Sequence, residues 1–185
     1  MRWVTLSHVH LDRAAAPWLI KRFVDPEAEF GFAAWGMDGK IPEPGSVVVP
    51  EGATPFAIPG AELGLHDADG TCCAKILRKY GLDADPGLVA VERVIAAGVR
   101  HTFGEDPAPD ETAEESMLGG ALNLIGAGLG LAFHDPEHLA IAFGMYDGLL
   151  AHCRMRLLPA DVTAAAPFLP PQKIPFLREA LTARG

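Results

Sequence analysis

Two clusters of polar residues contain side chains that could act together on a ligand. The first consists of His8, His10, Asp12 and Arg13, and it follows a strand-like run at residues Arg2–Leu6. A helix is expected to begin there, and the first N–H groups of a helix lack intrahelical partners. Such a position suits a binding site. The alternative is structural, with Asp12 capping the helix, Arg13 paired with an acid and the histidines solvated.

The second cluster is His66, Asp67 and Asp69, directly before a helix that Thr71 can cap. Imidazole and carboxylate ligands together suit zinc, iron or manganese. We therefore predict that this cluster meets the first one in a pocket and that His10 shares a divalent metal ion with it. In the alternative, the two aspartates only shape a turn and His66 is exposed.

Asp147 is a charged residue inside the apolar stretch 139–150. A buried charge needs a partner, so we expect Asp147 to face Arg13 or Arg22 or to complete the metal shell. Its neighbours Tyr146 and Cys153 are expected to pack in the core.

Composition restricts the class of protein. The chain has 185 residues, 49% of them hydrophobic, and a net charge of −9. This size suits one domain, and the acidic balance argues against a nucleic-acid partner. The motif Gly126-x-Gly128 lacks a third glycine and a preceding strand, so no nucleotide cofactor is expected.

Location and membrane contact can also be predicted. The start of the chain lacks the apolar segment of a signal peptide, and three cysteines without a secretory signal favour reduced thiols in the cytoplasm. The longest uncharged run, residues 117–133, is shorter than the ~20 residues of a membrane span. We expect it to be a buried helix packed through its glycines, and it offers a surface for a homodimer.

The pattern of elements predicts a helix-rich α+β single domain over residues 1–185, with a few short strands in the N-terminal third. Residues 159–185 form a proline-rich C-terminal extension with a short helix near 176–183. The expected elements are strands at Arg2–Leu6, 29–34 and 46–49, and helices at about 13–24, 71–80, 86–97, 110–133 and 135–157.

Several segments are typical of one family: Asp12-Arg13, 17–23, 25–28, 52–64, His66, 79–82, Tyr146-Asp147 and Cys153-Arg154. Through them about residues 3 to 156 resemble the chromate-resistance domain family, which forms the C-terminal part of bacterial ChrB-type chromate-responsive proteins. The resemblance implies a bacterial domain linked to the chromate stress response. Relatives commonly carry a cysteine where this chain has Ala16, and paired histidines where it has Leu65-His66.

Two functions follow as hypotheses. In the first, a metal-dependent enzyme acts on an anionic or oxygenated substrate, and His66, Asp12 and Arg13 are catalytic. In the second, a non-catalytic domain senses an oxyanion such as chromate. The metal ligands of the first would be His10, His66, Asp67 and Asp147, and the anion ligands of the second would be Arg13, Lys21, Arg22 and Arg154.

Overall fold

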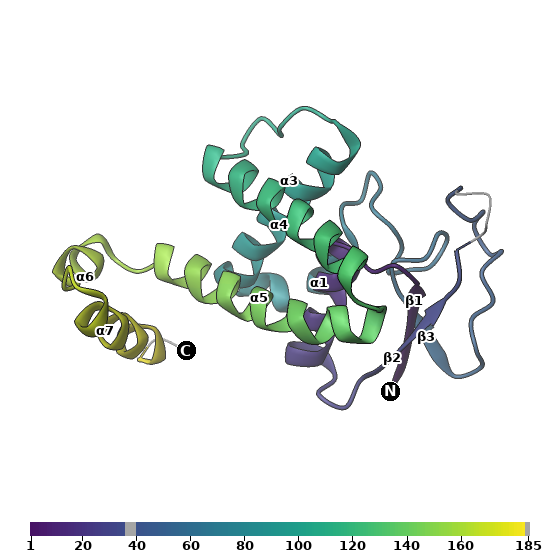
Figure 1. Cartoon of the computed structure of the whole chain (residues 1–185), viewed down its shortest axis with the longest axis horizontal. Helices are drawn as coiled ribbons and strands as arrows, with labels where there is room; N and C mark the ends of the chain where they lie inside the picture. Colours follow the sequence, from purple (N-terminus) through teal and green to yellow (C-terminus); the bar gives the residue numbers. More distant parts are fainter. Residues whose placement is uncertain (36–39, 184–185) are drawn as a thin grey trace.

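The computed structural model describes residues 1–35 and 40–183 and confirms the α+β class. Its elements in chain order are β1 (Arg2–Leu6), α1 (Asp12–Leu19), the π-helical turn η1 (Ile20–Val24), β2 (Glu29–Ala33), β3 (Ala53–Pro55), α2 (Cys72–Lys79), the 3₁₀ turn η2 (Leu82–Ala84), α3 (Pro86–Phe103), α4 (Ala113–Ala132), α5 (Asp135–Arg156), α6 (Ala160–Ala165) and α7 (Pro170–Thr182). Figure 1 shows the strands at one end of the molecule and α6 and α7 at the other.

The sheet is parallel, with strand order β2-β1-β3. Strand β1 occupies the centre and is covered on both faces, so four of its five residues are buried, the polar Thr5 among them. The strand expected at residues 46–49 is wrong. Val47 and Val49 do alternate inward against a small apolar cluster around β1, but their backbone pairs with no strand, and the third strand is β3 instead.

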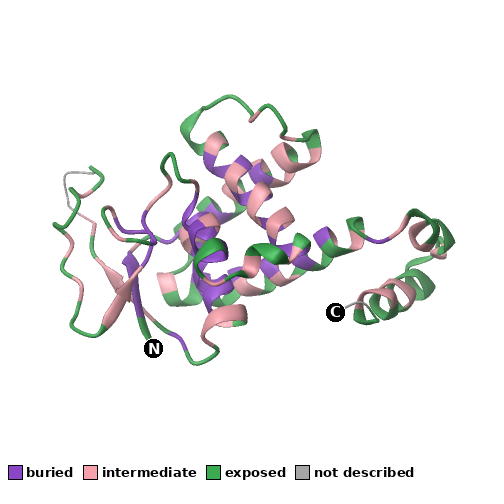
Figure 2. Cartoon of the chain, turned by 180° about the vertical axis from the view of Figure 1, so that it is seen from behind, coloured by how far each residue is buried: buried purple, intermediate pink, exposed green. Residues whose placement is uncertain are grey.

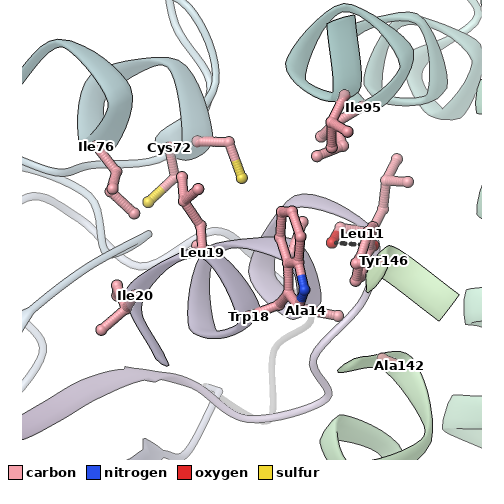
Figure 3. Close-up of a cluster of buried hydrophobic side chains, with 14 of the residues drawn as sticks. Leu11, Ala14, Trp18, Leu19, Ile20, Cys72, Ile76, Ile95, Ala142 and Tyr146 are labelled. Carbon is pink, nitrogen blue, oxygen red and sulfur yellow. Dashed lines mark hydrogen bonds between the residues drawn. The ribbon is translucent and has the colours of Figure 1, made fainter. Parts of the chain in front are cut away.

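The main core surrounds α1, which lies in the middle of the chain's helices (Figure 3). Trp18 is 1% exposed and its ring lies 5.6 Å from that of Tyr146. The Tyr146 hydroxyl donates to the Leu11 carbonyl over 2.9 Å. Tyr146 and Cys153 are both buried, which confirms their expected place in the core. Both residues belong to α5. The hydrogen bond from Tyr146 therefore attaches α5 to the start of α1, although Tyr146 and Leu11 are 135 positions apart in the sequence.

Helices α3 and α4 cross at a pair of glycines. A Cβ at Gly98 would lie 2.7 Å from the Gly119 carbonyl oxygen, so two backbones are in contact there. Helix α3 runs to Phe103, beyond the expected end near residue 97, because Gly98 serves this crossing instead of ending the helix. Helix α4 begins after Thr112, whose hydroxyl forms a capping box with Glu115, and not at the expected Asp110.

The expectation that residues 117–133 are buried is wrong for most of them. In α4 only Gly119 and Gly126 are buried, because one side of the helix packs on the rest of the chain and the other does not. Among the described residues, no helix is both long and apolar enough to cross a membrane.

The C-terminal extension leaves the body after α5. Figure 2 shows that burial concentrates in β1, α1 and the inner sides of the larger helices. Within the described residues, α6 and α7 contain no buried residue. Helix α7 begins at Pro170, before the expected start near residue 176, because prolines are well tolerated in the first turn of a helix.

Candidate functional site

The connection between β1 and α1 has an unusual backbone. His8 and Leu11 have φ angles of 57° and 43°, a left-handed region that side chains other than glycine seldom adopt. The Asp135 carboxylate holds this loop, accepting from the N–H groups of His8 over 3.0 Å and Val9 over 2.8 Å. Strained backbone of this kind is often found at functional sites. The start of α5 therefore fixes the loop that carries the first polar cluster.

Asp12 caps a different helix from the one expected. Its two carboxylate oxygens accept from the N–H groups of Cys72 over 2.8 Å and Cys73 over 3.1 Å, at the start of α2. The residue before α1 is Leu11, and none of the described side chains caps that helix. Asp12 is 8% exposed, and each of its oxygens already accepts a hydrogen bond from α2.

Arg13 is a largely buried cation with few partners. Its guanidinium donates to the Ser7 carbonyl over 3.1 Å and lies 4.9 Å from the ring centre of Trp35. The Trp35 indole donates to the same carbonyl over 2.7 Å. Burial lowers the pKa of Arg13, while the charges of Asp12 and Asp135 act in the opposite direction. Arginine nevertheless stays protonated in proteins, so the site holds a fixed positive charge.

Arg13 lines a pocket of about 170 Å³ whose lining also includes His10 and His66, but not His8. His10 and His66 thus line one pocket, whereas Asp67 and Asp69 of the second cluster are outside its lining. His10 Nε2 is hydrogen-bonded to the Asn123 carbonyl over 2.9 Å. The His66 ring stacks on Phe103, and its buried Nδ1 has no hydrogen-bond partner among the described residues. The full lining is His10, Leu11, Asp12, Arg13, Trp35, Ile41, Leu65, His66, Val99, Thr102 and Phe103.

Apart from Lys21, four of the predicted site residues are outside this lining. Asp67 forms an ion pair with Lys75 over 2.7 Å, which lowers the pKa of Asp67. Arg154 forms a pair with Asp85 over 2.8 Å. These side chains are occupied by partners on neighbouring elements, and therefore do not point toward Arg13.

Asp147 and Arg22 are the other two, and they pair with each other over 2.7 Å. The Trp18 indole also donates to Asp147 over 2.8 Å. The hydrogen bond from Arg22 lowers the pKa of Asp147. The expectation that Asp147 faces an arginine is confirmed, and this pair joins α5 to η1 instead of forming part of the pocket. Lys21 also lies elsewhere, donating to the Ala28 carbonyl over 3.0 Å.

These contacts do not assemble the four proposed metal ligands. Within residues 1–35 and 40–183, no three His, Cys, Asp or Glu side chains are grouped to hold a metal ion. Cys72 and Cys73 are buried free thiols, and burial raises the pKa of each well above its usual value. Burial also raises the pKa of Cys153 to about 11. At neutral pH these cysteines are thiols, which are poor nucleophiles and metal ligands.

Sequence reasoning missed the aromatic walls of the pocket. Trp35 stands two residues after β2. Phe103 is the last residue of α3, beyond the expected end of that helix. A tryptophan close behind a strand end was the signal that could have indicated Trp35. The backbone carbonyl of Asn123 leaves no trace in the sequence.

Fold and pocket together define a small α+β domain with a partly buried arginine in a mainly apolar pocket. The chain belongs to the ChrB C-terminal domain family, whose model matches residues 3–153. It is 32% identical over 122 residues to Protein ChrB of Cupriavidus metallidurans, covering 65% of this chain and 33% of that protein. It is 30% identical over 126 residues to 5'-nucleotidase SurE of Methylococcus capsulatus, covering 65% of this chain and 48% of that protein.

The chain therefore spans about a third to a half of the curated relatives it matches. No solved structure matches it significantly. The family membership establishes a chromate-resistance type of domain and assigns no chemistry to its pocket.

Proposed function

We propose that this domain binds a small oxyanion at Arg13, with chromate as the first candidate because of the family. The observation that carries the proposal is a partly buried guanidinium that lines a pocket together with two imidazoles. A guanidinium offers five N–H donors in a plane that matches the geometry of oxyanions. In the described structure the Arg13 guanidinium makes one hydrogen bond to the protein, so donors remain for a ligand.

The surroundings of Arg13 favour anion capture. Leu11, Val99 and Phe103 line the pocket, and an apolar setting strengthens the attraction between opposite charges. Stacking on Trp35 fixes the plane of the guanidinium. The orphaned Nδ1 of His66 is a further polar atom that a bound anion could satisfy when it carries a proton.

The start of α1 contributes less than its position suggests. The N–H of Arg13 already donates to the His10 carbonyl over 3.0 Å, and that of Ala14 to the Leu11 carbonyl over 2.9 Å. Carbonyls of the strained loop thus accept from N–H groups that a helix N-terminus usually leaves open for an anion. Side chains therefore provide the recognition in this proposal.

A metal-dependent enzyme remains the second candidate. The observation in its favour is that His10 and His66 line the same pocket. Against it, Asp12 is engaged with α2 and His10 Nε2 with a carbonyl. A cytoplasmic location, in which the three free thiols stay reduced, is part of both proposals.

Calorimetric titration with chromate tests the proposal, with molybdate and sulfate as anions that do not oxidise thiols. We expect binding by the wild type and a loss of at least about tenfold in Arg13→Gln, which corresponds to about 1.4 kcal/mol. Arg22→Gln and Arg154→Gln are matched controls because both arginines are paired outside the pocket. Equal affinity in Arg13→Gln and the wild type would contradict the proposal.

A further inference from the structure

The outward face of α4 exposes large apolar side chains that are not part of the pocket lining. Met117, Leu124, Ile125 and Leu131 are 65%, 70%, 51% and 92% exposed. The sequence has no Asp, Glu, Lys or Arg between Glu115 and Asp135, so no charge interrupts this face. Contiguous exposed apolar surface of this kind marks an interaction site. In Figure 1, α4 packs on α3, with which it makes most of its contacts.

The glycines of α4 fall into two groups. Gly119 and Gly126 are buried, and a Cβ at either would meet other parts of the chain, the nearest atoms being the Gly98 nitrogen and the His10 ring. Gly120, Gly128 and Gly130 meet nothing within 4 Å among the described residues, and of these Gly120 and Gly128 lie on one stripe of the helix. Glycine weakens a helix interior, and the fold of one chain gives no packing reason for these two. Close approach of a second helix would supply one.

One stripe of this face is symmetric about Leu124, and Ile125, whose mirror position is Asn123, lies beside that stripe. Residues at equal distances on either side match in size: Met117 with Leu131, Gly120 with Gly128, and Ala121 with Ala127. Their spacing of three and four residues keeps them on one stripe of the helix. An antiparallel pair of such helices would place large side chains opposite large ones and glycine opposite glycine.

We propose that α4 forms a homodimer interface in which two copies pack antiparallel about a two-fold axis at Leu124. A two-fold interface requires a surface that is complementary to itself, and the symmetric order of residues meets that requirement without a foreign partner. It is this symmetry that identifies a second copy of the chain as the occupant of the face.

The size of the face indicates a weak dimer. The symmetric stripe spans 15 positions, from Met117 to Leu131, which is about 20 Å of helix at 1.5 Å per residue. Stable dimers bury about 800 Å² on each partner, and a single helix face supplies less. Each chain also carries a net charge of −9, so the copies repel at low salt. Association should therefore depend on concentration and become tighter as salt screens this repulsion.

Sedimentation velocity tests association across protein concentrations from about 1 µM to about 1 mM, the range in which small interfaces dissociate. We expect the wild type to pass from monomer to dimer. Leu124→Asp places two like charges on the axis and should remain monomeric throughout. Val48→Asp is the matched control, since Val48 is 86% exposed on a distant loop. A wild type that stays monomeric, or a Leu124→Asp variant that dimerises like the control, overturns the proposal.

Cysteine cross-linking tests the orientation. Under mild oxidation, Leu124→Cys should form a covalent dimer with itself, and a mixture of Met117→Cys and Leu131→Cys should cross-link to each other. Met117→Cys alone should not, because an antiparallel pair separates the two copies of residue 117. Oxidised wild type measures the background from the three buried native cysteines. Cross-linking of Met117→Cys to itself with none in the mixture overturns the antiparallel arrangement.

Discussion

Replacing Asp12 by alanine should destabilise the protein even though it removes a charge from an acidic chain. The carboxylate is 8% exposed and accepts two N–H groups at the start of α2. A buried donor left without a partner costs about 1–3 kcal/mol. Two such donors, at Cys72 and Cys73, give an expected loss of about 2–4 kcal/mol in the free energy of unfolding, the lower total allowing for partial relaxation. The Thr71 hydroxyl still caps α2 by accepting from the Ala74 N–H, so this helix should persist in the variant.

Urea unfolding followed by circular dichroism measures this loss, and amide hydrogen exchange locates it. We expect the amides of Cys72 and Cys73 to exchange faster in Asp12→Ala, while amides in α5 follow only the global change. Asp12→Asn keeps one acceptor oxygen and should lose less. Asp69→Ala is the matched control because Asp69 is exposed beside the same helix, and its loss should stay below about 0.5 kcal/mol.

The reasoning would be refuted if Asp12→Ala lost under about 1 kcal/mol with both amides still protected. That result would mean that the two N–H groups find other acceptors, and it would free Asp12 for a role in the pocket. If Asp12→Ala lost much stability and Asp12→Asn lost none, the hydrogen bonds would matter and the charge would not.

Three further predictions concern packing, pH and metal. Gly119→Ala should cost about 1–3 kcal/mol because its Cβ would meet the α3 backbone. Gly144→Ala, where the described structure leaves open space, should stabilise by about 0.5–1 kcal/mol, and thermal unfolding compares the two. Hydrogen bonds from Arg93 lower the pKa of Glu115 to about 2 from its usual 4.5. The unfolded state then binds more protons, so stability should fall as pH drops from 4.5 toward 2, and Glu115→Gln should show a flatter acid titration. If a metal is bound, elemental analysis should find it at one equivalent in the wild type and lost in His66→Ala; its absence from the wild type would remove the metal-dependent candidate.

Helix termini could be predicted wherever the signal is local. Asp85-Pro86 opens α3, Thr71 caps α2, and Gly81 takes the left-handed conformation expected after α2, with a φ of 65°. Each of these features depends on backbone and side-chain groups within a few residues. The start of α4 was misplaced because Thr112 and Asp110 both suit a cap, and Asp110 instead pairs with Arg93.

The meeting of His10 and His66 in one pocket was also predictable, because both belong to polar clusters at the entrances of helices. The partner of each charge was harder to predict. Asp147 pairs with Arg22 across 125 residues of sequence, and Asp12 serves a helix sixty residues away. A buried charge must find a partner, but the sequence does not say which of several arginines or N–H groups comes close.

The sequence by itself determined the class of fold, the family and the polar residues that a ligand could meet. Its composition and periodicity are enough for this, because apolar spacing and capping residues act locally. Only the tertiary structure decided that Arg13 is buried against Trp35, and that α4 turns Gly119 inward and Leu124 outward. Both sides of α4 are equally apolar in sequence, so the side that packs is selected by the close backbone contact with Gly98, which a larger residue would prevent.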